Sequence, residues 1–295
     1  MRCAVLAVVF VLAALVNHSA RASTIQFLSP FGLNTGVAYG VDGLKVVGES
    51  NIGWLYDGNS YQVIQVPWGG TTIPLDVSGT NIVGSSGVSS FLFDGLNYTK
   101  LTHPLGINGT VAWGIDGSNI VGEYIDASSI THGFLYDGTS YTTVDVPAAK
   151  HTFLRGISGA DLVGYYTDAK NLIHGFRFNG TTYTTFDDPL FLGAGISAAQ
   201  GIDGNTIVGN NSSTPFAAAY YYDGATFNHP FGIEAPLSGD HRFYGVSGNR
   251  IVGEFNNRPF IYVIPEPSSI LMAILAGFGL FGVAHRKRNR ASPRR

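Results

Sequence analysis

Cysteine is almost absent from this chain, and the single one, Cys3, lies next to the start. The rest of the chain therefore has no disulfide and no thiolate ligand for a metal. Charged residues are also scarce, at 13% of 295 residues. No glycine-rich phosphate loop, HExxH helix or G-x-S-x-G elbow occurs. The sequence thus predicts no cofactor, no metal and no catalytic residue.

Long apolar runs are missing everywhere except at the two ends. At the N-terminus, Arg2 precedes a thirteen-residue apolar stretch over 4–16, which is followed by Ala20-Arg21-Ala22. A positive start, an apolar stretch and an A-x-A site are typical of a secretory signal peptide. We expect residues 1–22 to be this peptide, with the Sec export machinery and signal peptidase as partners. Cleavage after Ala22 removes Cys3 and leaves Ser23 as the first residue.

The C-terminal run covers 270–284 and follows Pro265-Glu266-Pro267. Its fifteen residues make about 23 Å of helix, which is short for a bilayer core of about 30 Å but able to span it with local thinning. Four cations of a basic cluster follow it and should stay on the cytoplasmic side: Arg286, Lys287, Arg288 and Arg290. We expect a transmembrane helix over 270–284 within a tail covering 265–295. The segment is either a plain anchor or a sorting signal.

This tail resembles the PEP-CTERM sorting signal of Gram-negative bacteria, because its Pro-Glu-Pro, apolar helix and Arg-rich end stand in the same order. The resemblance implies an exosortase as partner, an inner-membrane intermediate, removal of the tail and delivery to the cell surface or an exopolysaccharide matrix. The five residues 291–295 after the basic cluster depart from the minimal pattern. Such tails occur on many unrelated proteins, so the resemblance implies no biochemical activity.

The segment between the two ends is acidic. Residues 23–264 contain nine Lys and Arg against nineteen Asp and Glu, a net charge of −10, compared with −3 for the whole chain. Nucleic acid is bound mainly through cations on phosphates, so this body is not expected to bind it.

One phrase, G-[IV]-[DS]-G followed by V-G, occurs six times in this body. It begins at Gly40, Gly114, Gly156, Gly201 and Gly245, and once in a relaxed form at Asp76. A second phrase follows the first five copies: an aromatic stretch, Asp-Gly or Asn-Gly, and a Tyr- or Phe-led stretch that ends in proline. Asp-Gly and Asn-Gly between β-rich runs predict hairpins. Each unit therefore reads as four short strands, and no helical period interrupts them.

Four strands repeated every 40 residues or so are typical of a β-propeller blade. We therefore predict an all-β domain over 23–264, a β-propeller of six four-stranded blades. The sixth unit lacks its last strand, and Thr24–Pro30 resembles the missing piece. We expect this N-terminal strand to complete the last blade and so remove exposed sheet edges. An open β-solenoid or a sandwich is the alternative.

The repeats are also similar to extracellular repeats of the HAF type, with His-Gly-Phe-Leu-Tyr-Asp-Gly at 132–138 as the nearest match. That resemblance implies an extracellular repeat protein without an assigned chemistry.

Strand alternation places the turns between strands one and two, and three and four, on one face of the propeller. The longer and more variable loops lie on the other face, where function tends to concentrate. We predict that any ligand binds there or in the channel mouth beneath it. The candidate residues are Glu123, Asp126, His132, Asp168, His174, Asp240 and His241. For His132 and His174, the same place in two units favours packing over catalysis. Asp42, Asp116, Asp203 and the equivalent serines are expected to bond turn amides.

Three functions remain open from the sequence. The first and favoured one is a non-enzymatic surface or matrix protein that binds a polysaccharide or another envelope protein. The second is an exported glycan-active hydrolase or lyase, which needs a clustered carboxylate pair with a raised pKa in the channel mouth. The third is a repeat protein that serves only as bulk adhesive.

Overall fold

The computed structural model describes residues 23–191, 196–213, 216–231 and 240–264. Residues 25–262 form one compact unit, and residues 1–24 and 263–295 are assigned to a second unit. The predicted signal peptide, the Pro265–Pro267 motif, the helix over 270–284 and the basic cluster all lie outside the described residues. Within the described part of the chain, no helix is long and apolar enough to cross a membrane.

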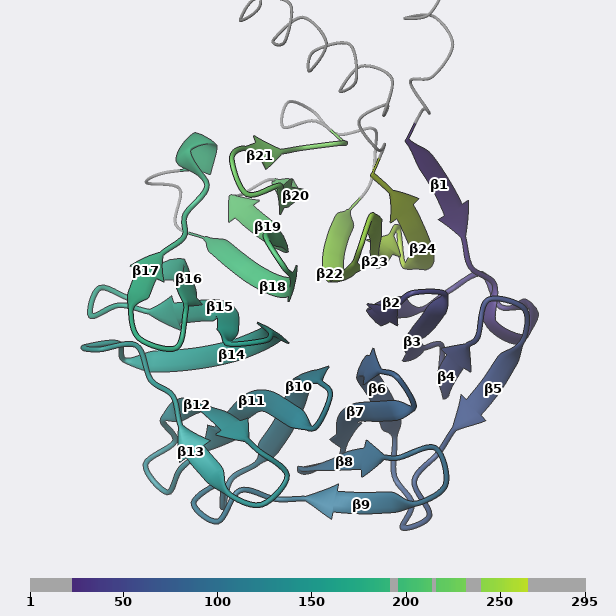
Figure 1. The fold of residues 1–295 in the computed structure, drawn as a ribbon, viewed down its shortest axis with the longest axis horizontal. Helices are drawn as coiled ribbons and strands as arrows, with labels where there is room; N and C mark the ends of the chain where they lie inside the picture. The colour runs from purple at the N-terminus through teal and green to yellow at the C-terminus, as the bar shows by residue number, and fades with distance from the viewer. Residues whose placement is uncertain (1–22, 192–195, 214–215, 232–239, 265–295) are drawn as a thin grey trace, which may run out of the picture. The chain divides into compact units, whose positions relative to one another are not determined.

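Six four-stranded antiparallel sheets are arranged around a central axis (Figure 1). This confirms the predicted all-β propeller with six blades. The innermost strands are β2 (Val37–Asp42), β6 (Thr72–Ser78), β10 (Thr110–Asp116), β14 (His151–Ser158), β18 (Ser197–Asp203) and β22 (His241–Ser247). The second strands are β3 (Lys45–Glu49), β7 (Asn81–Ser86), β11 (Asn119–Ile125), β15 (Asp161–Thr167), β19 (Thr206–Ser213) and β23 (Arg250–Phe255).

The outer half of each blade is shorter and more exposed. The third strands are β4 (Gly53–Tyr56), β8 (Ser89–Phe93), β12 (Thr131–Tyr136), β16 (Ile173–Phe178), β20 (Phe216–Tyr222) and β24 (Arg258–Val263). The outermost strands are β5 (Tyr61–Ile64), β9 (Tyr98–Leu101), β13 (Tyr141–Thr143), β17 (Tyr183–Thr185), β21 (Phe227–Asn228) and β1 (Thr24–Phe27). Among the described connections between blades, two contain a 3₁₀ turn: η1 (Pro30–Gly32) and η2 (Pro189–Phe191).

The last blade combines the two ends of the propeller sequence. β1 pairs with β24, giving the strand order β1-β24-β23-β22 (Figure 1). Just past β1, the Leu28 N–H donates to the Pro259 carbonyl at 2.8 Å, and Leu28 is buried. The N-terminal strand therefore closes the ring, as the incomplete sixth repeat predicted.

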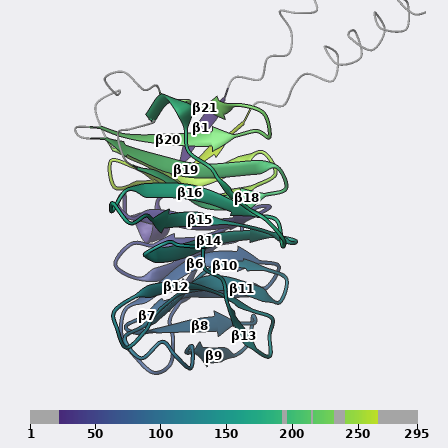
Figure 2. The same ribbon diagram turned by 90° about the vertical axis from the view of Figure 1, so that its left-hand side faces the viewer.

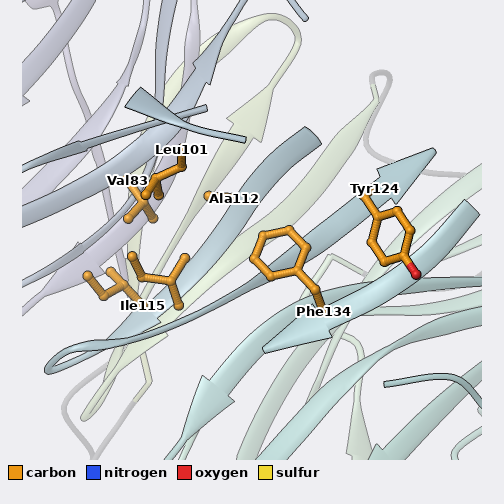
Figure 3. Packing of buried hydrophobic residues seen from close by; sticks show 7 residues of the cluster. Val83, Leu101, Ala112, Ile115, Tyr124 and Phe134 are labelled. Carbon is orange, nitrogen blue, oxygen red and sulfur yellow. The ribbon is translucent and has the colours of Figure 1, made fainter. Parts of the chain in front are cut away.

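The core consists of the repeated apolar positions packed between neighbouring blades. One such cluster joins Val83 and Leu101 of blade 2 to Ile115, Tyr124 and Phe134 of blade 3 (Figure 3). Phe134 is fully buried, as are Phe91 and Phe176 at the equivalent position of blades 2 and 4. The aromatic residue of the second repeated phrase is thus a buried part of the inter-blade core.

The connections separate into two faces, which Figure 2 shows from the side. On the turn face of blades 1 and 2, the glycine between the third and fourth strands lies close to the turn between the first and second: a Cβ on Gly58 would be 3.1 Å from the Leu44 Cβ, and one on Gly95 3.3 Å from the Thr80 Cβ. On the loop face, the other connections hydrogen-bond to one another, as in Thr110 N–H to the Val88 carbonyl (3.2 Å). β1 begins and β24 ends on the turn face. The loop face therefore carries neither entry nor exit of the propeller chain.

Candidate functional site

The axial channel is lined by three rings of residues, one residue per blade in each ring. The mouth ring, at the turn face, consists of Asp42, Ser78, Asp116, Ser158, Asp203 and Ser247. The second ring, the glycine ring, lies two residues before the mouth ring in each innermost strand: Gly40, Asp76, Gly114, Gly156, Gly201 and Gly245. The third ring, named the bulge ring for the β-bulge described below, consists of the residue directly before each glycine-ring position: Tyr39, Leu75, Trp113, Arg155, Gln200 and Tyr244.

The mouth ring links every blade to the next. The Asp42 carboxylate accepts from the Gly79 N–H at 2.7 Å, and the Ser78 hydroxyl oxygen accepts from the Gly117 N–H at 3.0 Å. The same bond recurs across the other four seams, including the seam between blades 6 and 1. These side chains bond turn amides, as expected, but the turn belongs to the neighbouring blade. Three of the six are carboxylates, so this mouth is acidic.

The glycine ring brings the innermost strands into close contact. A Cβ at Gly245 would lie 3.2 Å from the Gly40 Cα, and one at Gly201 would lie 3.3 Å from the Gly245 Cα. Asp76 is the exception, since blade 2 carries a carboxylate where the other five blades have glycine. A Cβ at Gly40 would come within 2.6 Å of an Asp76 carboxylate oxygen, so the Asp76 side chain fills space that glycine leaves free.

Asp76 is a half-buried carboxylate held by two backbone donors. The N–H groups of Val77 and Ile115 each donate to it at 2.9 Å. Burial raises the pKa of Asp76 to about 7; the two N–H bonds oppose this rise, and the charges of Asp42 and Asp116 add to it. Sequence reasoning did not select Asp76. The signal in the sequence was that the second copy of the repeated phrase begins with Asp76, whereas the other five begin with glycine.

Two cavities meet at Asp76. The outer basin, about 110 Å³, lies inside the mouth ring, and the inner chamber, about 30 Å³, lies inside the bulge ring. Both are lined by Asp76, Ile157, Ile202 and Val246. A water needs about 10–15 Å³ of such space. The channel therefore has room for several waters or a small ligand, but not for a polymer chain.

The bulge ring owes its position to an irregularity in each innermost strand. The register of β14 against β15 shifts between Leu154 and Gly156, which leaves Arg155 unpaired, and the same shift occurs in the other five blades. A bulge re-aims the extra residue. Here it turns Arg155 and its equivalents toward the axis, where their side chains narrow the channel.

Arg155 is the only cation among these six residues. Its guanidinium carbon lies 3.7 Å from the centroid of the Trp113 ring, and its Nη2 donates to the Tyr165 hydroxyl at 2.8 Å. Nη2 also lies 3.2 Å from Glu123 Oε2, in an alignment too poor for a hydrogen bond. Arg155 is only 8% exposed. Sequence reasoning selected Glu123 but not its partner.

The predicted ligand-face residues fall into separate groups. His132 and His174 have the same surroundings in blades 3 and 4. His132 Nδ1 lies 2.7 Å from Asp145 and its Nε2 lies 3.6 Å from Asp126; for His174 the distances are 2.7 Å to Asp187 and 3.8 Å to Asp168. Each ring thus connects its strand to the adjoining loop. Because the two carboxylates lie at opposite ring nitrogens, they cannot ligate one ion together.

The last two predicted residues lie in blade 6. Asp240 is 72% exposed and lies 3.9 Å from Arg242. His241 is buried, and its ring contacts Phe231 and Phe255. Over the described ranges, no three His, Cys, Asp or Glu side chains are placed to hold a metal ion. A ligand site formed by all seven predicted residues together stays a prediction.

A buried polar network between blades 4 and 5 was also missed. Asp188 is fully buried; His229 Nε2 lies 2.6 Å from its carboxylate, and the Asn211 amide donates to the same oxygen at 2.6 Å. Burial opposes ionisation, but His229, the Leu190 N–H and Asn211 together hold the pKa of Asp188 below its usual value. With its charge compensated, this network connects the two blades.

Comparisons with known proteins show the fold alone. No protein-family model matches the chain, and no curated protein does either. Among solved structures, a proposed gluconolactonase matches with a TM-score of 0.51 and 12% identity over 83% of this chain and 93% of that one. The β-propeller domain of the Trilobed protease from Pyrococcus furiosus gives 0.48 and 11% over 77% and 80%.

A fungal lectin, the six-bladed β-propeller of Aleuria aurantia, gives a TM-score of 0.42 and 14% identity over 66% of this chain and 75% of that one. Identities this low do not carry activity or ligand from one protein to another. The likeness of this chain to these proteins is therefore one of fold alone.

Proposed function

We propose that the chain is an exported cell-surface or matrix protein whose propeller binds a polysaccharide or another envelope protein without chemical change. The proposed address consists of the signal peptide at 1–22 and the sorting tail at 265–295. A closed ring with a dense core gives the loop face a rigid support. That support suits a binding module exposed outside the cell.

One observation carries the binding part of the proposal: five exposed apolar side chains, together called the apolar strip, lie on neighbouring loop-face connections of blades 2 and 3. Val88 is 76% exposed, Ile107 70%, Leu105 60%, Trp68 40% and Ile130 37%. Exposed apolar side chains that gather on one face of a soluble protein are candidates for a binding surface.

The loops that carry this apolar strip are joined to one another. Ser86 Oγ donates to the Gly69 carbonyl at 3.4 Å, and the Asn108 amide donates to the Asp126 carbonyl at 2.7 Å. Loops 65–71, 87–88, 102–109 and 126–130 contain one carboxylate, Asp126, and no Lys or Arg. On a body of net charge −10, so neutral a surface suits an uncharged partner. The Trp68 ring offers a stacking surface for a neutral sugar.

Binding is tested with the purified propeller, residues 23–264, on glycan arrays and against envelope extracts. Replacing loops 126–130 and 168–172 with glycine linkers, or Val88, Leu105 and Ile107 with serine, is expected to abolish binding. Leu96 is 87% exposed on the turn face, so Leu96→Ser is the matched control and should bind normally. Unchanged binding by both sets of loop-face variants would contradict the assignment.

The address is tested by cell fractionation and mass spectrometry of both ends, with and without the exosortase. The expected mature protein begins at Ser23 and ends near Pro265–Pro267, and loss of the exosortase leaves the tail attached in the inner membrane. Full-length chain in the cytosol with both ends intact would refute the proposal.

A glycan-active hydrolase or lyase is the second candidate, and Asp76 is the observation that favours it. Burial raises the pKa of Asp76 to about 7, and Asp42 and Asp116 lie near enough to affect it. A carboxyl poised near neutral pH suits general acid-base catalysis. Because the outer basin beside Asp76 is only about 110 Å³, this candidate is restricted to the end of a glycan and does not extend to the middle of a polymer chain. Release of reducing ends or unsaturated sugars by wild type, lost in Asp76→Asn, would support this candidate. No release by wild type from the glycans that it binds would exclude it.

A further inference from the structure

His132 and His174 occupy the same position in the third strands of blades 3 and 4, and each ring has one nitrogen engaged. His132 Nδ1 lies 2.7 Å from one oxygen of Asp145, and the other oxygen accepts from the Gly133 N–H. His174 makes the same contact with Asp187 at 2.7 Å. An ionised carboxylate only accepts hydrogen bonds, so Nδ1 is the donor. In the neutral ring, Nε2 therefore carries the lone pair and can serve as a ligand.

That second nitrogen faces another acceptor. His132 Nε2 lies 3.6 Å from Asp126 Oδ2, and His174 Nε2 lies 3.8 Å from Asp168 Oδ2. Both separations are longer than an N–H···O hydrogen bond, which spans about 2.7–3.2 Å. Among the described residues, these four atoms have no hydrogen-bond partner. In each blade, two electron-rich atoms thus face each other across a space that suits a cation.

The loops hold these carboxylates in place. The N–H groups of Ser128 and Ile130 both donate to Asp126 Oδ1 at 2.8 Å, which leaves Oδ2 on the side of the ring. The Ile130 N–H is the main cause of a pKa of Asp126 below its usual value, so the group is a carboxylate at neutral pH. The Asp168 loop repeats both bonds at 2.8 Å. The same local design therefore occurs twice, in neighbouring blades.

We propose that each of these pairs binds one Zn²⁺ ion, through Asp126 Oδ2 and His132 Nε2 in blade 3 and through Asp168 Oδ2 and His174 Nε2 in blade 4. Zinc bonds of about 2.0–2.2 Å at a tetrahedral angle place two ligand atoms about 3.3 Å apart. The pairs at 3.6 and 3.8 Å therefore have to close only slightly.

The surroundings suit zinc. Asp145 holds His132 through Nδ1, as a carboxylate does for many zinc-ligating histidines. Imidazole with carboxylate fits Zn²⁺, whereas Ca²⁺ requires six to eight oxygens. The side chains of His132 and Asp126 are 22% and 28% exposed, so an ion can reach them from solvent. Two protein ligands leave the remaining positions of the ion to water or to a group on a partner.

The blade 3 site should bind zinc more tightly than the blade 4 site. Loop 126–130 contains no Lys or Arg, whereas the charge of Lys170, two residues after Asp168, acts on that carboxylate. A cation near the pair repels Zn²⁺. We therefore expect two sites of unequal affinity per chain. The inference does not depend on the proposed function, because zinc binding requires neither export nor a glycan.

The test is calorimetric titration of the propeller, residues 23–264, with ZnCl₂ at pH 7 in the presence of excess CaCl₂. Wild type should bind two ions. Asp126→Asn keeps the Oδ1 acceptor but removes the charged ligand, so one ion should be lost, and Asp126→Asn with Asp168→Asn should lose both. Asp145→Asn should weaken the blade 3 site about 10–100-fold. Asp137→Asn, which alters a carboxylate that accepts amides of a turn on the opposite face, should bind as wild type does.

A crystal structure of wild type soaked in ZnCl₂, with anomalous diffraction at the zinc edge, provides a readout that does not depend on any variant folding. One peak is expected between His132 Nε2 and Asp126 Oδ2 and another at the equivalent place in blade 4. Binding should also weaken from pH 7 to pH 5, because protons compete with the ion for the imidazole.

Three results would overturn the proposal: no saturable zinc binding by wild type, two ions still bound by the double variant, or zinc peaks only at other places. Equal binding of Ca²⁺ at the two pairs would overturn the assignment to zinc.

Discussion

Ser247 and Gly43 are 204 residues apart in the sequence, and the Gly43 N–H donates to the Ser247 hydroxyl oxygen at 3.1 Å. This bond crosses the seam between blade 6 and blade 1. At the rim of the same blade, β1 pairs with β24. The ring is therefore closed twice, near the axis by side chains and at the edge by a strand.

The axial closure predicts that Ser247→Ala lowers the free energy of unfolding by about 0.5–1.5 kcal/mol, the net value of one hydrogen bond. Ser158→Ala is the matched variant, because Ser158 makes the same bond to Gly204 at 3.0 Å across an interior seam. Urea denaturation of both measures whether the closing seam is equivalent to the others. No change in either variant would show that the mouth ring does not stabilise the propeller.

The pairing of β1 with β24 predicts that removal of residues 23–28 lowers the free energy of unfolding. The loss should be no smaller than that of a buried leucine such as Leu28, which is about 2–5 kcal/mol. The exposed edge of β24 should also promote self-association. Thermal unfolding and light scattering measure both effects. A synthetic peptide covering 23–30 should restore the monomer. A truncated chain as stable and monomeric as the parent would contradict this closure.

The fold could be predicted because its determinants repeat. Asp57-Gly58 and its equivalents mark a turn in five units, and the incomplete unit after Gly253 called for a strand from elsewhere. The bulge at Arg155 could not be predicted, because strand alternation does not show where one extra residue enters a ladder. The sequence also could not show that Asp42 accepts from an amide of the neighbouring blade, because only the folded ring places the Gly79 turn beside it.

The core predicts a large effect for Phe134→Ala, because Phe134 is fully buried between blades 2 and 3 (Figure 3). Loss of such a ring usually costs about 3–5 kcal/mol. Leu96→Ala is the control: Leu96 is 87% exposed, so its loss should change stability by less than about 0.5 kcal/mol. Urea denaturation at pH 7 compares the two. A Phe134→Ala loss as small as that of Leu96→Ala would refute the assigned packing.

Asp76 predicts a specific pH dependence of stability. Its pKa is raised from 3.8 to about 7 in the folded chain, mainly by burial. The folded state therefore holds its proton more tightly than the unfolded state. Asp76 thus favours folding at low pH, and this contribution is lost as the pH rises from about 4 through about 7.

Asp76→Asn should remove that slope, because asparagine stays neutral. Compared with wild type, the variant should gain stability as the pH rises from 5 to 8, by up to a few kcal/mol, at about 1.4 kcal/mol per unit of pKa shift. Urea denaturation across this range measures the difference. Parallel stability curves for the two proteins would show that Asp76 titrates normally.

The candidate site was harder to predict than the fold, because its residues are the ones that break the repeat. Asp76 replaces a glycine, and Arg155 occupies a position where other blades have tyrosine, leucine, tryptophan or glutamine. Reasoning from the positions that all repeats share does not select Asp76 or Arg155, because each occurs in one blade only. Among the residues that the repeat does share, His132 and His174 each lie between two carboxylates and so connect a strand to a loop.

The pairing of β1 with β24 has a consequence for the order of events in biosynthesis. The first strand of the propeller to leave the ribosome has its partner in the last, so it must wait, unpaired, until nearly the whole domain has been made. On the proposed export route the chain would cross the membrane unfolded, and this delay would then be an advantage, because the propeller closes only after its last strand has followed the rest.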